Sequence, residues 1–250
     1  MPFLSRFRAR KHTFSSPLAP DERFSAIGDI HGRDDLFCQL LDKMAETEAV
    51  NERVVTVGDY IDRGEESAQV LRRLRDYHAT AEGQLICLKG NHEDMLLKFL
   101  DDPTERGPRW LRYGGLQTFA SFQLAPPSET APGMEWVSAR DRLRETMGPE
   151  LEAWLRSLPS SWQSGNVTVV HAGADPAQPI SAQPERTLLW GHPEFEATPR
   201  RDGQWVVHGH TIVDQPQVLE GRIAIDTGAY ATGRLTAARI TPGNVDILST

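Results

Sequence analysis

Five short polar motifs, in a fixed order along the chain, carry residues that could bind metal ions. They occupy residues 28–32 (GDIHG), 58–64 (GDYIDRG), 90–93 (GNHE), 171–173 (HAG) and 208–211 (HGHT). Their side chains offer carboxylate, imidazole and amide oxygen but no thiolate, a set that suits Mn²⁺, Fe²⁺/Fe³⁺ or Zn²⁺ better than Ca²⁺. The motifs therefore predict a metal centre assembled from segments that are distant in the sequence.

Each motif follows, directly or after one residue, a run of apolar, largely β-branched residues that is typical of a buried strand. The runs span residues 24–27, 54–57, 85–88, 167–170 and 205–207. In open α/β sheets, ligands bind beyond the carboxyl ends of the strands. We therefore expect the five motifs to meet at strand ends.

The rest of the chain predicts an α/β (α+β) fold with two packed mixed β-sheets flanked by helices. Apolar residues recur at helical spacing in 34–48, 67–77 and 93–100, which alternate with the first three strands. Residues 110–158 have a helical composition without strand signals, and we place a helical insertion at about 103–165. Short strands separated by glycine-containing turns then predict a second, largely antiparallel sheet.

The composition limits the class of protein. The 250 residues carry a formal net charge of −8, which argues against broad binding to nucleic acid. No apolar run approaches the ~18 residues that span a bilayer, so we expect a soluble, cytoplasmic protein without a membrane partner. Cys38 and Cys87 give no spacing for a disulfide framework or a thiolate zinc site. No pattern indicates an oligomeric state.

The start of the chain differs in composition from the remainder. Residues 1–22 hold four basic side chains, three prolines and no acid before Asp21. They show no sustained periodicity, and we expect a disordered or loosely docked arm there. A single domain is expected to occupy residues 23–250.

Each motif taken alone has an ordinary structural explanation. Asp29 or Asp59, in a glycine-flanked turn, could simply hydrogen-bond its own backbone. Asn91 could cap the helix that follows it, and His171 or His210 could be a hydrogen-bonded residue at a strand end. The occurrence of all five motifs, in order and at equivalent strand ends, argues instead for one shared centre.

With these motifs the chain resembles the metallophosphoesterases, and within them the phosphoprotein phosphatase family of bacterial and phage type. The resemblance spans about residues 24–235, and the Asp-Arg-Gly ending of residues 58–64 matches that family rather than metallophosphoesterases at large. It implies the calcineurin-like sandwich of two sheets. It also implies two divalent metal ions, with Mn²⁺ favoured and Fe or Zn as alternatives.

The resemblance also implies a role for each motif residue. Asp59 would bridge the two metal ions. The first ion would also be held by Asp29 and His31, and the second by Asn91, His171 and His210. His208 would be a structural residue, or would contact the ligands without binding a metal ion itself.

Three further residues would act on the substrate. His92 would be the general acid on the leaving oxygen, and Asp62 would orient its imidazole. Arg63 would grip two phosphate oxygens through its forked donors. Hydrolysis would proceed by direct attack of a hydroxide that bridges the two metals, without a phosphoenzyme.

The chain departs from the family pattern at two places. Relatives often carry a second phosphate-clamping arginine two residues after Leu-Leu-Trp, whereas residues 188–192 here are LLWGH. His192 could bind phosphate in its place, Arg186, Arg200 or Arg201 could reach the site, or one clamp is missing. Residues 113–115 are YGG where relatives often have NGG, which leaves the contribution of the insertion open.

The implied function is that of a metal-dependent phosphomonoesterase, foremost a serine/threonine protein phosphatase, with dual specificity left open. Its partner would be a phosphorylated protein or a small phosphoester. A hydrolase of dinucleoside polyphosphates is the main alternative, because specificity lies in loops around a shared core. A catalytically silent phosphate-binding module is a further alternative, although it predicts lost ligands and this chain keeps them.

The sequence argues against two other classes of phosphate-processing enzyme. A cysteine phosphatase needs an arginine six residues after its nucleophile, but Met44 follows Cys38 and Glu93 follows Cys87 at that interval, which excludes this class. No Gly-x-x-x-x-Gly-Lys-Ser/Thr string is present, so a P-loop nucleotide hydrolase is unsupported.

Overall fold

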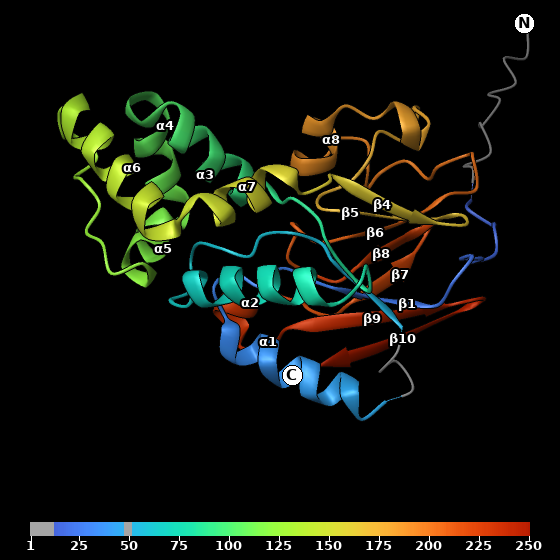
Figure 1. Cartoon of the computed structure of the whole chain (residues 1–250). Helices are drawn as coiled ribbons and strands as arrows, with labels where there is room; N and C mark the ends of the chain where they lie inside the picture. The colour runs from blue at the N-terminus through green and yellow to red at the C-terminus, as the bar shows by residue number, and fades with distance from the viewer. Residues whose placement is uncertain (1–12, 48–51) are drawn as a thin grey trace, which may run out of the picture.

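Two five-stranded sheets form the centre of the molecule (Figure 1). The computed structural model describes residues 13–47 and 52–250. The first sheet, sheet A, has the strand order β10-β9-β1-β2-β3. Its strands are β1 (Phe24–Ile27), β2 (Arg53–Thr56), β3 (Leu85–Cys87), β9 (Thr236–Thr241) and β10 (Asn244–Ser249). Strands β1, β2 and β3 run parallel, and β9 pairs antiparallel with both β1 and β10.

The second sheet, sheet B, is mixed. Its order is β4-β5-β6-β8-β7, with β4 (Ser161–Ser164), β5 (Val167–Val170), β6 (Trp205–His208), β7 (Gln217–Leu219) and β8 (Arg222–Ala224). Strands β5, β6 and β8 are parallel, and only the edge pairs are antiparallel. The expectation of a largely antiparallel second sheet is therefore wrong. Strands β5 and β6 can run parallel because a long crossover that contains α8 (Glu185–Trp190) joins them.

The inner faces of the two sheets share one apolar core. Side chains from both sheets fill it, among them Phe24, Val55, Val57, Val167, Val169, Val207 and Ile223. Alternate residues of sheet A, such as Ile27, point to the opposite face, as the period of two in a strand requires. That face packs against α1 (Asp34–Ala45) and α2 (Ser67–Thr80), so helices cover the outside of sheet A (Figure 1).

A group of helices lies beside the sheets (Figure 1). It consists of α3 (Asn91–Asp101), α4 (Pro103–Trp110), α5 (Leu116–Ser121), α6 (Gly133–Met147) and α7 (Pro149–Ser157). The predicted insertion at about 103–165 corresponds to α4 through α7, whereas its last residues form strand β4 at the edge of sheet B. No helix among the described residues is long and apolar enough to cross a membrane.

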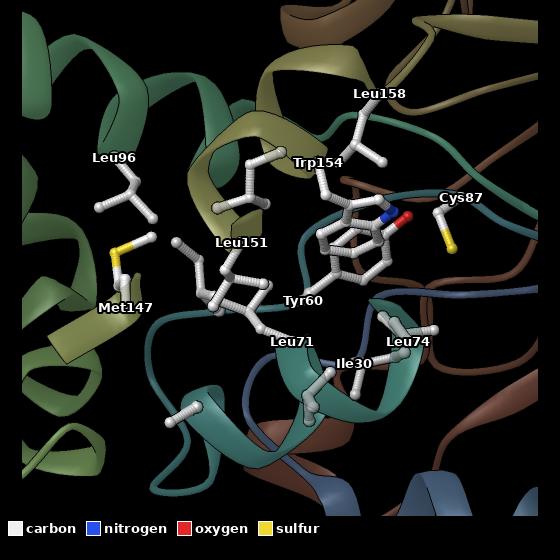
Figure 2. Packing of buried hydrophobic residues seen from close by; sticks show 14 of the residues in the cluster. Ile30, Tyr60, Leu71, Leu74, Cys87, Leu96, Met147, Leu151, Trp154 and Leu158 are labelled. Atoms are coloured by element: carbon white, nitrogen blue, oxygen red, sulfur yellow. The ribbon is translucent and has the colours of Figure 1, made fainter. Parts of the chain in front are cut away.

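The helical group is anchored to the loop that carries the GDYIDRG motif. Figure 2 shows Trp154 and Leu151 of α7 packed toward Tyr60 of that loop and Leu71 of α2. The rings of Tyr60 and Trp154 are stacked, with centroids 6.3 Å apart. Burial of this apolar surface therefore holds the insertion against the strand ends where the motifs lie.

Residues 13–22 are docked on sheet B, although the sequence predicts a disordered or loosely docked arm through residue 22. Leu18 is buried in the core between the sheets. The N–H of Phe14 donates to Glu220 at 2.9 Å, and the indole of Trp205 donates to the carbonyl of Ser16 at 3.1 Å. Such burial and hydrogen bonding offset the entropy lost on ordering the chain. The rest of the predicted arm, residues 1–12, lies outside the described residues.

Candidate metal centre

The loops that carry the motifs converge at the carboxyl ends of the strands. The N–H groups of Ile30 and His31 donate to the carbonyl of Asp59 at 3.1 and 2.8 Å, which joins the loops after β1 and β2. Gly58 has a φ of +106°, and any Cβ there would collide with the backbone of Gly90 in the loop after β3. The close approach of these loops brings their polar side chains into one mostly buried cluster.

Asp59 lies between two groups of nitrogen ligands. Its Oδ2 is 3.4 Å from His31 Nε2 and 3.8 Å from His92 Nε2, and its Oδ1 is 3.4 Å from His171 Nε2. Two atoms that bind one ion at about 2.1 Å are separated by about 3 Å, so these spacings suit shared ions. Two candidate metal-binding groups result, His31–Asp59–His92 and Asp59–His171–His210. Asp59, which is common to both, has the position of a bridging ligand.

Asn91 faces two imidazoles at hydrogen-bond distance. Its Oδ1 is 2.7 Å from His171 Nε2 and 2.8 Å from His210 Nδ1. The Nδ1 of His171 donates to the carbonyl of Val57 at 3.0 Å, which leaves a lone pair on Nε2. Two lone pairs this close repel each other unless a cation lies between them. The donor set of Asn91, His171 and His210 therefore fits a bound metal ion.

Asp29 belongs to a cluster of buried carboxylates. Its oxygens accept the N–H of His210 at 3.0 and 3.2 Å, which joins the loops after β1 and β6. Burial raises the pKa of Asp29 well above its ordinary value, and the nearby carboxylates of Asp226 and Asp59 add to the rise. Burial also raises the pKa of Asp226 to about 6. A buried carboxyl that ionises needs a positive partner, which divalent ions would provide.

Burial keeps three imidazoles of the centre neutral. It lowers the pKa of His31 to about 3 and that of His171 to about 4, and it also lowers the pKa of His210. The Nδ1 of His31 donates to the carbonyl of Ile61 at 2.8 Å, so its Nε2 presents a lone pair toward Asp59. A neutral imidazole whose other nitrogen donates to a carbonyl is the form that binds metals.

Metal binding is expected to weaken as the pH falls and to release protons. Asp29 must lose its proton to become a ligand, and burial and the neighbouring carboxylates raise its pKa, so protons compete with the metal ion at higher pH than for an ordinary carboxylate. His31 and His171, with pKa values of about 3 and 4, are already neutral near pH 7 and release none there. Calorimetric titration of metal-free protein with Mn²⁺, in two buffers of different ionisation enthalpy and at several pH values, measures the protons released. Binding that releases no proton at any pH tested would contradict the assignment of Asp29 as a ligand.

His92 differs from the other imidazoles of the centre. Its Nδ1 is 2.6 Å from Asp62 Oδ2, and the Nη2 of Arg63 is 3.3 Å from its Nε2. Burial favours the neutral ring, but the carboxylates of Asp59 and Asp62 outweigh burial and raise the pKa of His92. An imidazole whose pKa is raised beside imidazoles whose pKa values are lowered is suited to act as an acid. The role of His92 as the general acid stays a prediction.

Two side chains that the sequence did not single out hold Asp62 in place. The indole Nε1 of Trp110 donates to Asp62 Oδ2 at 2.9 Å, and Thr118 Oγ1 donates to Oδ1 at 2.5 Å. Both are buried and come from the helical insertion, in α4 and α5. They lie 48 and 56 residues from Asp62 along the chain, and no motif spacing links such distant positions.

Trp110→Phe is expected to lower turnover of phenyl phosphate about 10–100-fold, since a hydrogen bond to a charged group contributes about 1.5–3 kcal/mol. The phenyl ring fills most of the indole's space but cannot donate to Asp62, so the imidazole of His92 loses part of its support. Steady-state kinetics and metal analysis of the same samples measure the effect. Unchanged turnover, or a loss explained by missing metal, would contradict this role.

Glu93 and Tyr230 also support the centre. The buried carboxylate of Glu93 accepts three backbone N–H groups of the loops after β2 and β3, at 2.8–2.9 Å. The guanidinium of Arg63 lies 4.8 Å from the ring of Tyr230, which also meets the ring of His31 edge-on at 5.4 Å. Glu93 was recognisable as the last letter of GNHE, whereas Tyr230 in α9 (Ala229–Thr232) belongs to none of the five motifs.

His208, the first histidine of the HGHT motif, has the contacts of a structural residue. Its ring meets Phe195 edge-on with centroids 4.9 Å apart, and its Nδ1 is 3.1 Å from the carbonyl of Gly209. Burial lowers the pKa of His208 to about 4. His210, two residues later, is the one that faces Asn91.

The candidates for a second phosphate clamp lie in different places. Arg200 is buried and donates to a carboxylate and two backbone carbonyls, so its guanidinium is already engaged. His192 Nε2 is 3.8 Å from Asp175 Oδ2, and it lines a hollow together with Arg201. Arg186 lines a different hollow, beside α3. A phosphate-binding role for His192 stays a prediction.

Backbone strain is concentrated at the centre. Positive φ angles, which residues other than glycine rarely adopt, occur at His31, Asp59, Asp62, Arg63 and His210. Such conformations cost of order 1–3 kcal/mol each and persist only where surrounding contacts enforce them. These strained residues are also proposed metal ligands, the carboxylate that would orient His92 and the arginine that would bind phosphate. Their coincidence marks this cluster as a functional site.

Comparison with known proteins agrees with the geometry. Residues 22–214 match the family described as calcineurin-like phosphoesterase. The bis(5'-nucleosyl)-tetraphosphatase PrpE (asymmetrical) of Oceanobacillus iheyensis is 29% identical over 241 residues, which cover 87% of this chain and 88% of that protein. The serine/threonine-protein phosphatase 2 of Escherichia coli is 27% identical over 226 residues, which cover 86% of this chain and 91% of that protein.

Solved structures show the same fold. One whose description proposes a diadenosine tetraphosphatase has a TM-score of 0.63 at 20% identity and covers 94% of this chain and 98% of that one. A protein serine/threonine phosphatase from Saccharomyces cerevisiae has a TM-score of 0.62 at 17% identity, with 94% and 84% covered. The sandwich of two mixed sheets is thereby confirmed. The family match covers most of this chain, and the clustered His and Asp side chains agree with it. The chain therefore belongs to the calcineurin-like phosphoesterase family.

Proposed function

We propose that this phosphoesterase hydrolyses dinucleoside polyphosphates and cleaves diadenosine tetraphosphate into a nucleoside triphosphate and a nucleoside monophosphate. The observation that carries the hydrolytic activity is Asp59, which is shared between two metal-binding groups and lies 3.8 Å from Nε2 of His92, the proposed acid. The substrate class is supported by several bis(5'-nucleosyl)-tetraphosphatases that match along most of their length. This substrate class replaces the protein phosphatase as the favoured interpretation.

The residues of the centre divide the chemistry among themselves. Bound divalent ions would supply positive charge and an activated water at the phosphorus. The side chains that would hold them are Asp29, His31, Asp59, Asn91, His171 and His210. Arg63 would bind two oxygens of the reacting phosphate. His92 would pass the proton on Nε2 to the leaving oxygen, while Asp62 accepts the hydrogen bond from Nδ1 and keeps the ring oriented.

A serine/threonine protein phosphatase is the second candidate. Escherichia coli serine/threonine-protein phosphatase 2 is 27% identical along 91% of its length. The buried pair of His92 and Asp62 also favours it, because the alkoxide released from phosphoserine is far more basic than a released nucleotide phosphate. A strong acid catalyst is worth more on such a substrate.

A substrate panel separates the two candidates. Metal-free protein is reloaded with Mn²⁺ and given diadenosine tetraphosphate, a phosphoserine peptide and p-nitrophenyl phosphate. We expect kcat/KM for diadenosine tetraphosphate to exceed that for the peptide at least about tenfold, with ATP and AMP as products on chromatography. The reverse order would support the protein phosphatase, and no turnover of any substrate would leave only a silent binding module.

Several properties stay predictions. Mn²⁺ is expected as the favoured metal, with Fe and Zn as alternatives, because the ligands are carboxylate, imidazole and amide oxygen. A cytoplasmic location and the absence of nucleic-acid and membrane partners likewise stay predictions.

A further inference from the structure

A hollow of about 520 Å³ lies between α3, α4 and α8, and Figure 1 shows α8 across from these two helices. We call it the α3–α4–α8 hollow. Arg106, Arg109 and Trp110 of α4 and Arg186 and Trp190 of α8 line it. Its volume falls in the range of about 300–1,000 Å³ that is usual for small-molecule sites.

The hollow is positively charged on an acidic protein. Its lining has one lysine and three arginines against the carboxylates of Asp94 and Glu185, a net charge of +2, whereas the whole chain carries −8. Both carboxylates are paired with lysines, at 2.7 and 3.0 Å. In the described part of the chain, Arg106, Arg109 and Arg186 have no carboxylate partner. Three uncompensated guanidinium groups therefore face one cavity and suit a polyanion.

The hollow also offers aromatic surfaces. The guanidinium of Arg109 lies 5.6 Å from the ring centroids of both Tyr113 and Trp190. The indole N–H of Trp190 donates to Asp94 at 3.2 Å, which fixes the ring at the wall of the cavity. Aromatic rings and arginine planes are the groups on which nucleobases stack. A nucleotide is recognised by cations that bind its phosphates and by an aromatic surface that stacks on its base, and the hollow has both.

One wall of the hollow is hydrogen-bonded to the group that orients the proposed acid. Trp110 lines the hollow, and its indole donates to the carboxylate of Asp62, which holds His92. The segment that follows Trp110 also reaches the centre, because the N–H of Arg63 donates to the carbonyl of Gly114 at 3.3 Å. Trp110 therefore places one wall of the hollow on the side of His92. Because His92 would protonate the leaving oxygen, the leaving group would lie on this side.

We propose that the α3–α4–α8 hollow binds the leaving nucleotide of a dinucleoside polyphosphate. Arg106, Arg109 and Arg186 contact its phosphates, and Trp190 lies against its base. The inference rests on the proposed function, since it names the part of that substrate which the hollow receives. An acidic phosphopeptide would match the charge but would leave the stacking surface unused.

An Arg109→Gln/Arg186→Gln variant of the Mn²⁺-loaded protein tests the inference. We expect kcat/KM for diadenosine tetraphosphate to fall at least about tenfold, mainly through KM, because two charged phosphate contacts are lost. Turnover of p-nitrophenyl phosphate, which has no nucleotide to place in the hollow, is expected to change less than about twofold.

The matched control is Arg72→Gln/Arg142→Gln, which removes the same charge from exposed positions of α2 and α6. It is expected to leave both activities unchanged. Equal losses on both substrates in the Arg109→Gln/Arg186→Gln variant, or no loss on diadenosine tetraphosphate, would overturn the inference. A larger loss on an acidic phosphopeptide than on diadenosine tetraphosphate would assign the hollow to peptides and overturn it as well.

Direct binding distinguishes failure of the hollow from failure of the proposed function. ATP and inorganic tripolyphosphate are titrated calorimetrically into metal-free protein, and ATP is expected to bind roughly tenfold tighter because its base adds stacking. The Arg109→Gln/Arg186→Gln variant is expected to weaken ATP binding at least about fivefold. If this holds but diadenosine tetraphosphate is not hydrolysed, the proposed function is wrong and the hollow stands. Hydrolysis with unweakened ATP binding would overturn the hollow alone.

Discussion

Asp59→Asn is expected to abolish metal loading and to lower turnover at least about 1,000-fold, which corresponds to about 4 kcal/mol of lost transition-state stabilisation. The two oxygens of Asp59 lie within 3.8 Å of three imidazole nitrogens. Although burial opposes ionisation, the nearby imidazole of His92 and its backbone N–H, which donates to Oδ1 at 3.0 Å, help to hold the pKa of Asp59 below its ordinary value. Asparagine keeps the shape but loses the charge and one acceptor oxygen, so it cannot bridge two ions.

The measurement is the metal content of dialysed Asp59→Asn protein together with its turnover of p-nitrophenyl phosphate. Asp141→Asn makes the same chemical change in an exposed ion pair with Arg140 and is the matched control. Circular dichroism checks that both variants keep the fold. An Asp59→Asn protein that retains its metal and most of its turnover would exclude a bridging role.

His92→Asn is expected to lower turnover of phenyl phosphate about 100–10,000-fold and to leave the metal content unchanged. The Nδ1 of His92 is held by Asp62 at 2.6 Å, so Nε2 is the nitrogen that would give its proton to the leaving oxygen, and it lies 3.8 Å from Asp59 and 3.3 Å from the Nη2 of Arg63. His92 also falls within a metal-binding group with His31 and Asp59. Loss of a metal ion from His92→Asn would make His92 a ligand and contradict the acid role.

The leaving group provides a second check on His92. A proton donor contributes most when the leaving oxygen is basic. The loss in His92→Asn is therefore expected to be larger on phenyl phosphate than on p-nitrophenyl phosphate, whose phenolate leaves more easily. Equal losses on both esters would indicate that His92 shapes the centre without donating a proton.

The parallel part of sheet A could be predicted because β1, β2 and β3 each contain a local run of apolar residues. Strand β1 occupies residues 24–27 as expected, and α2, which covers the sheet, begins at residue 67 as expected. Strands β9 and β10 were expected in the second sheet with the other strands after residue 166, but they pair with β1 and with each other in sheet A. Sheet B was harder, because the parallel directions of β5, β6 and β8 depend on crossovers and not on any local pattern: α8 lies between β5 and β6, and β7 lies between β6 and β8. Strand β4 is short and mostly polar, so no alternation marked it.

The proposed ligands could be predicted because each comes in a short string at the end of a strand. The structure brings all six together with His92, Asp62 and Arg63. The supporting side chains could not be predicted, because Trp110 and Thr118 reach Asp62 only through the packing of the insertion. The substrate specificity could not be predicted either, because the arginines of the α3–α4–α8 hollow come from two helices that are far apart in the sequence.

The number of metal ions in active protein tests the two-metal centre most directly. Protein stripped of metal is reloaded with increasing Mn²⁺, and elemental analysis is paired with the rate of hydrolysis of p-nitrophenyl phosphate. We predict that the rate rises until about two ions are bound per chain and then stays constant. Full activity with one bound ion or fewer per chain would contradict a centre bridged by Asp59.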